Sequence, residues 1–244
     1  MLTNNNVILI TGGTSGIGLE LVRQFYELEN KLIVASSNQV NLIQLKDRFP
    51  KIEIIVCDLG DSLSVQNLIE KCLTEHMEIN IVINNAGIQN NYIWTVEKDG
   101  QNKIENEIRI NLISPMQITY GLLPLLTSKQ KSSIINVSSA LAFAPKKSAP
   151  IYCATKAAIH NGTKALRYQL ESTSVKVFEI IPPLVETAMT EGRGKGKILP
   201  KQLVNEFIFD FKNDKFESSI GKTKLLRFIQ RISPKFIDKL MKNG

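Results

Sequence analysis

Short apolar runs alternate with longer amphipathic stretches from Val7 to about residue 185, and this alternation constrains the fold more than any other feature. The apolar runs are continuous, which is typical of strands buried on both faces of a sheet. Alternating strands and helices of this kind predict a doubly wound α/β fold, with helices on both faces of a parallel sheet. The predicted strands are Val7–Thr11, Leu32–Ala35, Ile52–Cys57, Ile79–Ile83, Ser133–Val137 and Val175–Ile180, and the predicted helices are Gly16–Leu28, Val40–Phe49, Ser62–His76, Gln101–Leu126 and Tyr152–Glu171.

The pattern changes after the sixth predicted strand, but no linker or internal repeat divides the chain. A polar, glycine-rich stretch leads to a short predicted helix over Leu203–Phe211, and Phe216–Ile220 predicts a last edge strand. We interpret residues 188–212 as a substrate lid and residues 213–244 as a basic C-terminal segment. Because 244 residues suit one large domain, we expect a single Rossmann-like domain over 1–244.

Cysteine content, histidine content and hydropathy exclude several classes of protein. Cys57, Cys72 and Cys153 form no Cys-x-x-Cys pair, and there are only two histidines, so we expect neither a disulfide framework nor a metal site. The apolar stretches are too short for a membrane span, and the residues after Met1 lack the charged region of a secretory signal. We therefore expect a cytoplasmic protein.

A glycine-rich turn follows the first predicted strand and opens the first helix, with the sequence Thr11-Gly12-Gly13-Thr14-Ser15-Gly16-Ile17-Gly18. Such a turn can present backbone N–H groups to a pyrophosphate at a helix N-terminus, where the helix dipole favours negative charge. We expect Gly12 to permit the turn, Gly16 to allow close approach of phosphate and Gly18 to allow close packing of helix on sheet. An ordinary strand–helix connection is the alternative.

The spacing Thr-Gly-x-x-x-Gly-Ile-Gly resembles that of the short-chain dehydrogenase/reductase family. The family's Asn-Asn-Ala-Gly motif is present as Asn84-Asn85-Ala86-Gly87 after the fourth predicted strand. The resemblance implies that the asparagines bridge backbone groups of the central sheet and that the small residues leave room for the adenosine ribose. A polar turn is the alternative. Asp58 lies where the family often contacts the adenine ring, or it caps the next helix.

Tyr152-Cys153-Ala154-Thr155-Lys156 matches the family's Tyr-x-x-x-Lys signature. Residues four apart share a helix face, so the phenol and the ammonium project together. A phenol ordinarily has a pKa of about 10. A nearby cation favours the phenolate, so we expect Lys156 to move the pKa of Tyr152 towards the range useful for acid–base catalysis.

Two further polar residues complete the catalytic set that the resemblance implies. Ser139, thirteen residues before Tyr152, matches the serine whose hydroxyl holds the substrate oxygen, and its neighbour Ser138 is the alternative. Asn111 matches the family's fourth catalytic residue, whose side chain would hold a water linking Lys156 to solvent. The alternative for Asn111 is a solvent-facing residue in the middle of a helix.

A segment after the sixth predicted strand, Pro182-Pro183-Leu184-Val185-Glu186-Thr187, resembles the family's Pro-Gly-x-Val-x-Thr segment, which passes the nicotinamide. Pro183 replaces the usual glycine, which removes an N–H and stiffens the turn. Together with Glu191–Lys197, this segment also resembles bacterial reductases associated with the D-alanylation of teichoic acids.

The resemblance implies an NAD(P)(H)-dependent oxidoreductase that transfers a hydride between the nicotinamide and a carbonyl or alcohol carbon. Ser139 would orient the carbonyl, Tyr152 donate the proton and Lys156 contact the nicotinamide ribose, with Asn111 completing a proton relay. A non-catalytic NAD(P)-binding scaffold or sensor of the same fold is the alternative. The implied cofactor contacts are Gly12, Thr14, Ser15, Gly16, Ile17, Gly18, Ser36, Ser37, Asn38, Asp58, Leu59, Asn85, Ala86, Gly87, Tyr152, Lys156, Pro182, Val185 and Thr187.

The choice between NAD and NADP depends on the end of the second predicted strand, which reads Ala35-Ser36-Ser37-Asn38. An acidic residue here would bind the ribose 2′-OH of NAD, and an arginine would accept a 2′-phosphate. Neither is present, but the two hydroxyls and the amide can bind a phosphate. The sequence therefore favours NADP(H) over NAD(H).

The positive charge is concentrated towards the C-terminus: residues 192–244 hold 13 Lys and Arg against five Asp and Glu. The stretch Lys222–Lys242 combines seven basic residues with apolar ones, a pattern that can lie on an anionic membrane surface. We expect its apolar residues to pack against the domain instead. No nucleic-acid motif accompanies the basic residues, so no nucleic-acid partner is expected.

A small carbonyl or alcohol compound is the expected substrate, and the resemblance implies a homo-oligomer. The segments expected to bind the substrate are Ile88–Gly100, Leu141–Ile151 and Ala188–Phe211. The aromatic residues Trp94, Phe143, Phe207 and Phe211 suggest an apolar pocket, and core packing explains them equally well.

Overall fold

All seven strands of the sheet run parallel, in the order β3-β2-β1-β4-β5-β6-β7. The computed structural model describes residues 1–242. The strands are β1 (Val7–Thr11), β2 (Lys31–Ser36), β3 (Glu53–Val56), β4 (Ile81–Asn84), β5 (Ser132–Val137), β6 (Val175–Ile181) and β7 (Glu217–Ser219). This is the doubly wound, Rossmann-like fold that the strand–helix alternation predicted.

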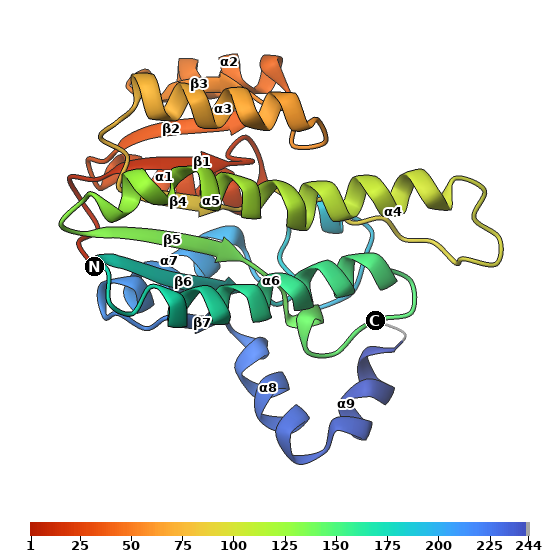
Figure 1. Cartoon of the computed structure of the whole chain (residues 1–244). Helices are drawn as coiled ribbons and strands as arrows, with labels where there is room; N and C mark the ends of the chain where they lie inside the picture. The colour runs from red at the N-terminus through yellow and green to blue at the C-terminus, as the bar shows by residue number, and fades with distance from the viewer. Residues whose placement is uncertain (243–244) are drawn as a thin grey trace.

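Helices cover both faces of the sheet (Figure 1). One face is covered by α1 (Gly16–Glu27), α2 (Gln39–Arg48) and α7 (Pro200–Lys212), and the other by α3 (Ser62–Glu75), α5 (Ser114–Thr127) and α6 (Pro150–Gln169). Successive side chains of a strand point to opposite faces, so Ile8 and Ile10 enter one core cluster and Leu9 the other. Burial on both faces explains why the strands are continuously apolar.

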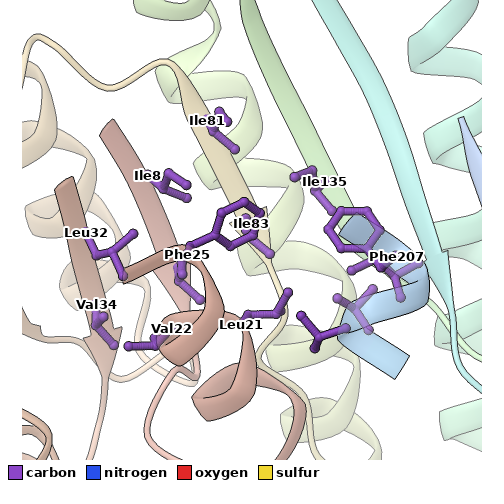
Figure 2. Packing of buried hydrophobic residues seen from close by; sticks show 14 of the residues in the cluster. Ile8, Leu21, Val22, Phe25, Leu32, Val34, Ile81, Ile83, Ile135 and Phe207 are labelled. Atoms are coloured by element: carbon purple, nitrogen blue, oxygen red, sulfur yellow. The ribbon is translucent and has the colours of Figure 1, made fainter. Parts of the chain in front are cut away.

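The core between the sheet and α1 also contains two aromatic residues of α7. Figure 2 shows Phe207 near Ile135 of β5, on the same side of the sheet as Phe25 of α1. Phe207 and Phe211 are fully buried, and the ring centroid of Phe211 lies 4.8 Å from that of Phe178. Of the two explanations that the sequence left open for Phe207 and Phe211, core packing is therefore correct and the substrate pocket is wrong. The α7 helix, which is the second half of the predicted lid, is a core helix.

The predicted helix Gln101–Leu126 is interrupted. It consists of α4 (Gly100–Ile108), a π-helical turn (Arg109–Ile113) and α5. Such turns are frequent at functional sites, and this one contains Asn111. Apolar periodicity predicts a continuous helix here because a single wide turn shifts the pattern by only one residue.

Two C-terminal helices, α8 (Lys222–Ile232) and α9 (Pro234–Met241), form a V that projects from the body of the molecule (Figure 1). We call them the C-terminal hairpin. Thr223 and Ile237 are buried, and Leu226 and Ile229 are partly buried, but the expected packing against the domain was wrong for most of the large apolar residues. Five of them are at least half exposed: Leu225, Phe228, Ile232, Phe236 and Leu240. In residues 1–242 no helix combines the length and the hydropathy that crossing a bilayer requires.

Replacing Phe211 by alanine tests the assignment of α7 to the core. We expect Phe211→Ala to lower the free energy of unfolding by about 3–5 kcal/mol, because a large buried side chain is lost and a cavity remains. Phe209 is 68% exposed on the same helix, so Phe209→Ala is the matched control and should change stability by no more than about 0.5 kcal/mol. Urea denaturation measures both, and equal losses in the two variants would contradict the assignment.

Candidate active site

A cavity of about 600 Å³ lies at the carboxyl ends of the central strands. The chain passes from β1 outward to β2 and β3 on one side and from β4 to β5, β6 and β7 on the other, so the strand order reverses between β1 and β4. In open α/β sheets, ligands bind in the crevice at such a reversal. The volume is in the range of small-molecule and cofactor sites.

Most of the residues that the sequence predicted line this cavity. The exceptions are Asn38 and Asn111, which do not reach its surface. The predicted lining residues are Gly12, Thr14, Ser15, Gly16, Ile17, Gly18, Ser36, Ser37, Asp58, Leu59, Asn85, Ala86, Gly87, Ser139, Tyr152, Lys156, Pro182, Val185 and Thr187. One cavity thus joins the glycine turn to the Tyr-x-x-x-Lys motif.

The glycine turn after β1 and the turn after β4 are hydrogen-bonded into one unit. The Asn85 side-chain amide donates to the carbonyl oxygens of Thr11 (3.0 Å) and Gly12 (3.1 Å), and Thr11 Oγ1 accepts from the backbone N–H of Asn85 (3.1 Å) and Ala86 (3.2 Å). Asn85 therefore bridges backbone groups of the central sheet, as the resemblance implied.

At two positions of this turn the surrounding atoms leave no room for a side chain. Gly12 has φ +68°, which favours glycine, and a Cβ there would lie 2.9 Å from the Ala86 Cα. A Cβ on Gly18 would lie 2.1 Å from the Gly12 carbonyl oxygen and 2.5 Å from the Asn85 amide nitrogen. Gly18 thus permits the first turn of α1 to pack on the loop, whereas we had expected packing of helix on sheet.

The side chain of Asn84 belongs to a buried polar chain that runs along one face of the sheet, from α5 to α6. Its amide donates to Thr119 of α5 (2.9 Å) and to Asn136 of β5 (2.8 Å), and the Asn136 amide donates to Thr163 of α6 (2.9 Å). This chain fixes α6 relative to β4 and β5. Because α6 carries Tyr152 and Lys156, the chain also fixes their place in the cavity wall.

Tyr152 and Lys156 are both buried on the first turns of α6, which begins at Pro150. The Lys156 ammonium donates to the carbonyl oxygen of Val137 at the end of β5 (2.9 Å) and lies 5.6 Å from the centroid of the Tyr152 ring. Ser139, two residues beyond Val137, lies close enough to the tyrosine side chain to favour its phenolate form, and its hydroxyl accepts from the Leu141 N–H (3.1 Å). Ser138 points elsewhere, with its hydroxyl directed at the Ile180 carbonyl (3.4 Å), so Ser139 is the serine that meets Tyr152.

Burial dominates the proton affinities of this pair. It raises the pKa of Tyr152 to about 12, and the nearby Ser139 hydroxyl acts in the opposite direction. Burial also lowers the pKa of Lys156 to about 8, opposed by the charges of Glu107 and Glu179. The expectation that Lys156 would bring the pKa of Tyr152 down was therefore wrong for this structure. At neutral pH Tyr152 is a phenol with a proton to donate.

Asn111 is 1% exposed, so the alternative of a solvent-facing residue is wrong. Its amide nitrogen donates to the Ile88 carbonyl (2.8 Å) and to Thr155 Oγ1 (3.3 Å), and its oxygen accepts from the Ile88 N–H (2.8 Å). Both amide hydrogens are directed at protein oxygens, so the side chain braces the loop after β4 rather than offering a free donor to water. A Cβ on Gly87 would lie 3.1 Å from the Asn111 oxygen and 3.5 Å from Lys156 Nζ.

Sequence reasoning missed Glu107, a fully buried carboxyl one turn before Asn111. Its Oε1 accepts from the Asn90 N–H (3.1 Å), and burial raises its pKa. The charges of Glu107 and Glu179 both raise the pKa of Lys156, and that of Glu107 has the larger effect. The available signal was its spacing, since positions 107 and 111 share a helix face.

Two of the predicted cofactor contacts, Asn38 and Asp58, form hydrogen bonds with nearby backbone N–H groups, which the sequence did not predict correctly. Asn38 caps α2 by accepting from the Asn41 N–H (3.0 Å), which accounts for its place outside the cavity. Asp58 does not cap the next helix, because Asp61 does, accepting from Leu63 and Ser64. Asp58 instead accepts from the Gly60 N–H (2.8 Å) and lines the cavity.

Backbone hydrogen bonds hold the segment 182–187, which follows β6, to the chain on both of its sides. The Pro182 carbonyl accepts from the Ala140 N–H (2.9 Å), and Leu184 and Glu186 exchange backbone hydrogen bonds with Ile198. Thr187 lies against Gly16, where a Cβ would come within 2.9 Å of the threonine methyl. The segment thus meets the glycine turn across the cavity, with Pro183 in place of glycine.

The comparisons with known proteins agree with this site. The family model for short chain dehydrogenases matches residues 6–197. The chain belongs to the short-chain dehydrogenase family. It is 38% identical over 194 residues to the uncharacterized oxidoreductase DltE of Bacillus subtilis, which covers 78% of this chain and 76% of that protein. This relative is a bacterial oxidoreductase, in agreement with the narrower resemblance to bacterial reductases. The family assignment makes the chain an NAD(P)-dependent oxidoreductase.

Further similarities concern one characterised relative and the fold. An NADP-dependent 3-hydroxy acid dehydrogenase of Schizosaccharomyces pombe is 28% identical over 199 residues, 79% of this chain and 76% of that protein. A Burkholderia cenocepacia short chain dehydrogenase in complex with NADP has a TM-score of 0.88 at 21% identity, with both chains covered fully. A Burkholderia phymatum family member in complex with NAD has a TM-score of 0.85 at 18% identity, over 100% of this chain and 98% of that one.

The low pKa of Lys156 can be measured without a substrate. We expect its side chain to lose half of its proton near pH 8, whereas exposed lysines titrate near 10.4. NMR titration of protein labelled at the lysine Cε carbons gives both values, and Lys156→Arg identifies the resonance. The burial argument fails if the Lys156 resonance titrates together with the exposed lysines.

Proposed function

We propose that this chain is an NADP(H)-dependent reductase of small carbonyl compounds, acting through Ser139, Tyr152 and Lys156, with Asn111 in support. The observation that carries the proposal is that Ser139, Tyr152 and Lys156 lie together on a cavity whose other wall is the glycine turn. A bound dinucleotide and a carbonyl carbon can therefore meet beside a proton donor.

The residues around the turn suit a dinucleotide. A Cβ on Gly12 or Gly16 would fill the space beside Ala86 or Thr187, and both glycines have positive φ. Ser15 is the N-cap of α1 but makes no side-chain capping bond, so its hydroxyl and the first N–H groups of the helix suit a pyrophosphate. Asp58 and Leu59 would meet the adenine, and Val185 and Thr187 the nicotinamide. When bound, the reduced nicotinamide supplies the hydride.

The protein side of the reaction is orientation and proton transfer. The Ser139 hydroxyl would hold the carbonyl oxygen, and Tyr152, kept protonated by burial, would donate its proton to that oxygen as it gains charge. The Lys156 ammonium would stabilise the phenolate left behind and contact the nicotinamide ribose. Asn111 would hold the loop after β4 at its distance from Lys156.

The cavity also carries a feature that favours an anionic group on the substrate. Lys146 lies half-buried in the cavity wall and forms no ion pair within residues 1–242. Burial and the nearby charge of Arg193 lower its pKa. A carboxylate or phosphate on the substrate would stabilise this cation. We therefore propose a carbonyl substrate that carries such a group.

A substrate panel tests the reaction class and the anionic group together. Keto acids, their neutral esters and simple ketones would be assayed with NADPH and with NADH by nicotinamide absorbance. We expect turnover, with keto acids preferred over their esters. Turnover of neutral ketones only would remove the anionic group from the proposal. Tight cofactor binding with no turnover across the panel would favour the non-catalytic scaffold or sensor.

Removing the tyrosine hydroxyl tests the assigned proton donor. We expect Tyr152→Phe to abolish turnover while cofactor affinity stays nearly unchanged, because only the proton donor is lost. Isothermal titration with NADPH checks the cofactor site in the same preparation. Retained turnover in Tyr152→Phe would contradict the mechanism.

An added carboxylate at the end of β2 tests the cofactor preference. The Ser36 hydroxyl lies 3.3 Å from that of Thr14, and Asp58 is the one acidic residue on the cavity wall within the described chain. We expect Ser36→Asp to weaken NADPH relative to NADH by about tenfold or more, since the carboxylate repels a 2′-phosphate. Asn67→Asp on α3, outside the cavity, is the control for added charge. An unchanged ratio in Ser36→Asp would favour NAD(H).

A homo-oligomer, a cytoplasmic location and lid movement of residues 188–199 stay predictions. Analytical ultracentrifugation of the purified chain tests the first.

A further inference from the structure

The C-terminal hairpin exposes large apolar side chains that the rest of the molecule does not cover. Phe228, Ile232 and Leu240 are 62%, 69% and 61% exposed, and Leu225 and Phe236 are at least half exposed. On α8, positions 225, 228 and 232 lie on one helix face, as do positions 236 and 240 on α9. Contiguous exposed apolar surface of this kind marks an interaction site.

Basic residues border this apolar face in a regular way. Each of the five exposed apolar residues directly follows a lysine or arginine: Lys224-Leu225, Arg227-Phe228, Arg231-Ile232, Lys235-Phe236 and Lys239-Leu240. Neighbouring positions are about 100° apart on a helix, so the basic side chains lie along the rim of the apolar face. Between residues 222 and 242 there are seven basic residues and one acid, Asp238.

Only some of these basic residues bind the hairpin to the body of the molecule. Arg227 pairs with Glu217 (2.8 Å) and lies 4.6 Å from the Phe143 ring centroid, and Lys224 pairs with Glu206. Five basic residues form no ion pair within residues 1–242 and remain at the surface: Lys222, Arg231, Lys235, Lys239 and Lys242. The α8 helix is thus anchored through one side, and its other side and α9 carry unmatched positive charge beside the apolar face.

We propose that the C-terminal hairpin docks this protein on an anionic membrane surface. Its five exposed apolar side chains would enter the boundary of the acyl chains, and its unpaired lysines and Arg231 would meet lipid phosphates at the rim. Amphipathic helices with this arrangement lie in the plane of a membrane interface without crossing it. The charge also favours lipid over a second copy of the chain, because pairing two hairpins would bring like charges together.

The docked hairpin would stand next to the active-site cavity. Met241, at the end of α9, lines the cavity, and the carbonyl of Lys242 accepts from the Lys147 N–H (3.1 Å) in the loop that precedes α6. The Gln230 amide donates to the Phe143 carbonyl (2.9 Å) in the same loop. A membrane at this surface would therefore lie close to the substrate side of the cavity.

Vesicle flotation tests the proposal with the full-length protein and needs no substrate. We expect binding to vesicles of phosphatidylcholine with about one third phosphatidylglycerol, little binding to phosphatidylcholine alone, and weaker binding at high salt. Phe228→Ser with Leu240→Ser should reduce the bound fraction about tenfold or more. Val40→Ser with Leu63→Ser removes equally exposed apolar side chains from α2 and α3 and should leave binding unchanged.

A second pair of variants separates the two parts of the surface. Arg231→Gln with Lys235→Gln keeps the apolar face and should lose the preference for anionic lipid. Circular dichroism and thermal unfolding establish that each variant is folded. Equal binding of wild type and Phe228→Ser/Leu240→Ser, or equal binding to neutral and anionic vesicles, would overturn the proposal. So would an oligomer without vesicles that the Phe228→Ser/Leu240→Ser variant breaks up, because the face would then bind a second copy.

Discussion

The hydrogen bonds of Asn85, the residue directly after β4, to the end of β1 are the constraint on which the rest of the site depends. They join the two strands between which the order of the sheet reverses, and they leave the glycine turn and the Ala86-Gly87 turn in contact. Any side chain on Gly12 or Gly18 would separate the turns. The cavity exists because two parallel strands end at the same level and their following loops are held together there.

Burial, more than charge pairing, sets the chemistry at the other wall of this cavity. Lys156 is fixed by a single hydrogen bond to the Val137 carbonyl, and its charge is supported from a distance by Glu107 and Glu179. Desolvation favours the neutral form of both the lysine and the tyrosine, so the pKa of Tyr152 rises and that of Lys156 falls. A protonated phenol beside a lysine that readily exchanges its proton suits a site that delivers a proton to a developing alkoxide.

The strands and the motifs could be predicted from the sequence because both depend on local pattern. Continuous apolar runs identified the first six strands of the sheet, and Gly12, Asn85, Ser139 and Tyr152 lie on one cavity because the fold brings the carboxyl ends of parallel strands together. The pattern could not predict which of several neighbouring polar residues caps a helix and which one faces the cavity. Asp61 rather than Asp58 caps α3, and Asn38 serves its own helix.

Other features depended on tertiary contacts that have no sequence period. The π-helical turn at Asn111, the buried carboxyl of Glu107 and the packing of Phe207 and Phe211 in the core follow from what surrounds them. The C-terminal hairpin shows the opposite case, since its apolar residues suggested packing and the body of the molecule offers them no surface.

Hydride transfer is the central claim, and isotope transfer tests it most directly. The protein would be incubated with NADPH deuterated at both C4 positions and with a carbonyl compound that it turns over, and the product analysed by mass spectrometry. Direct transfer predicts an alcohol with one deuterium on the carbinol carbon. An unlabelled alcohol, or deuterium released to water, would contradict it.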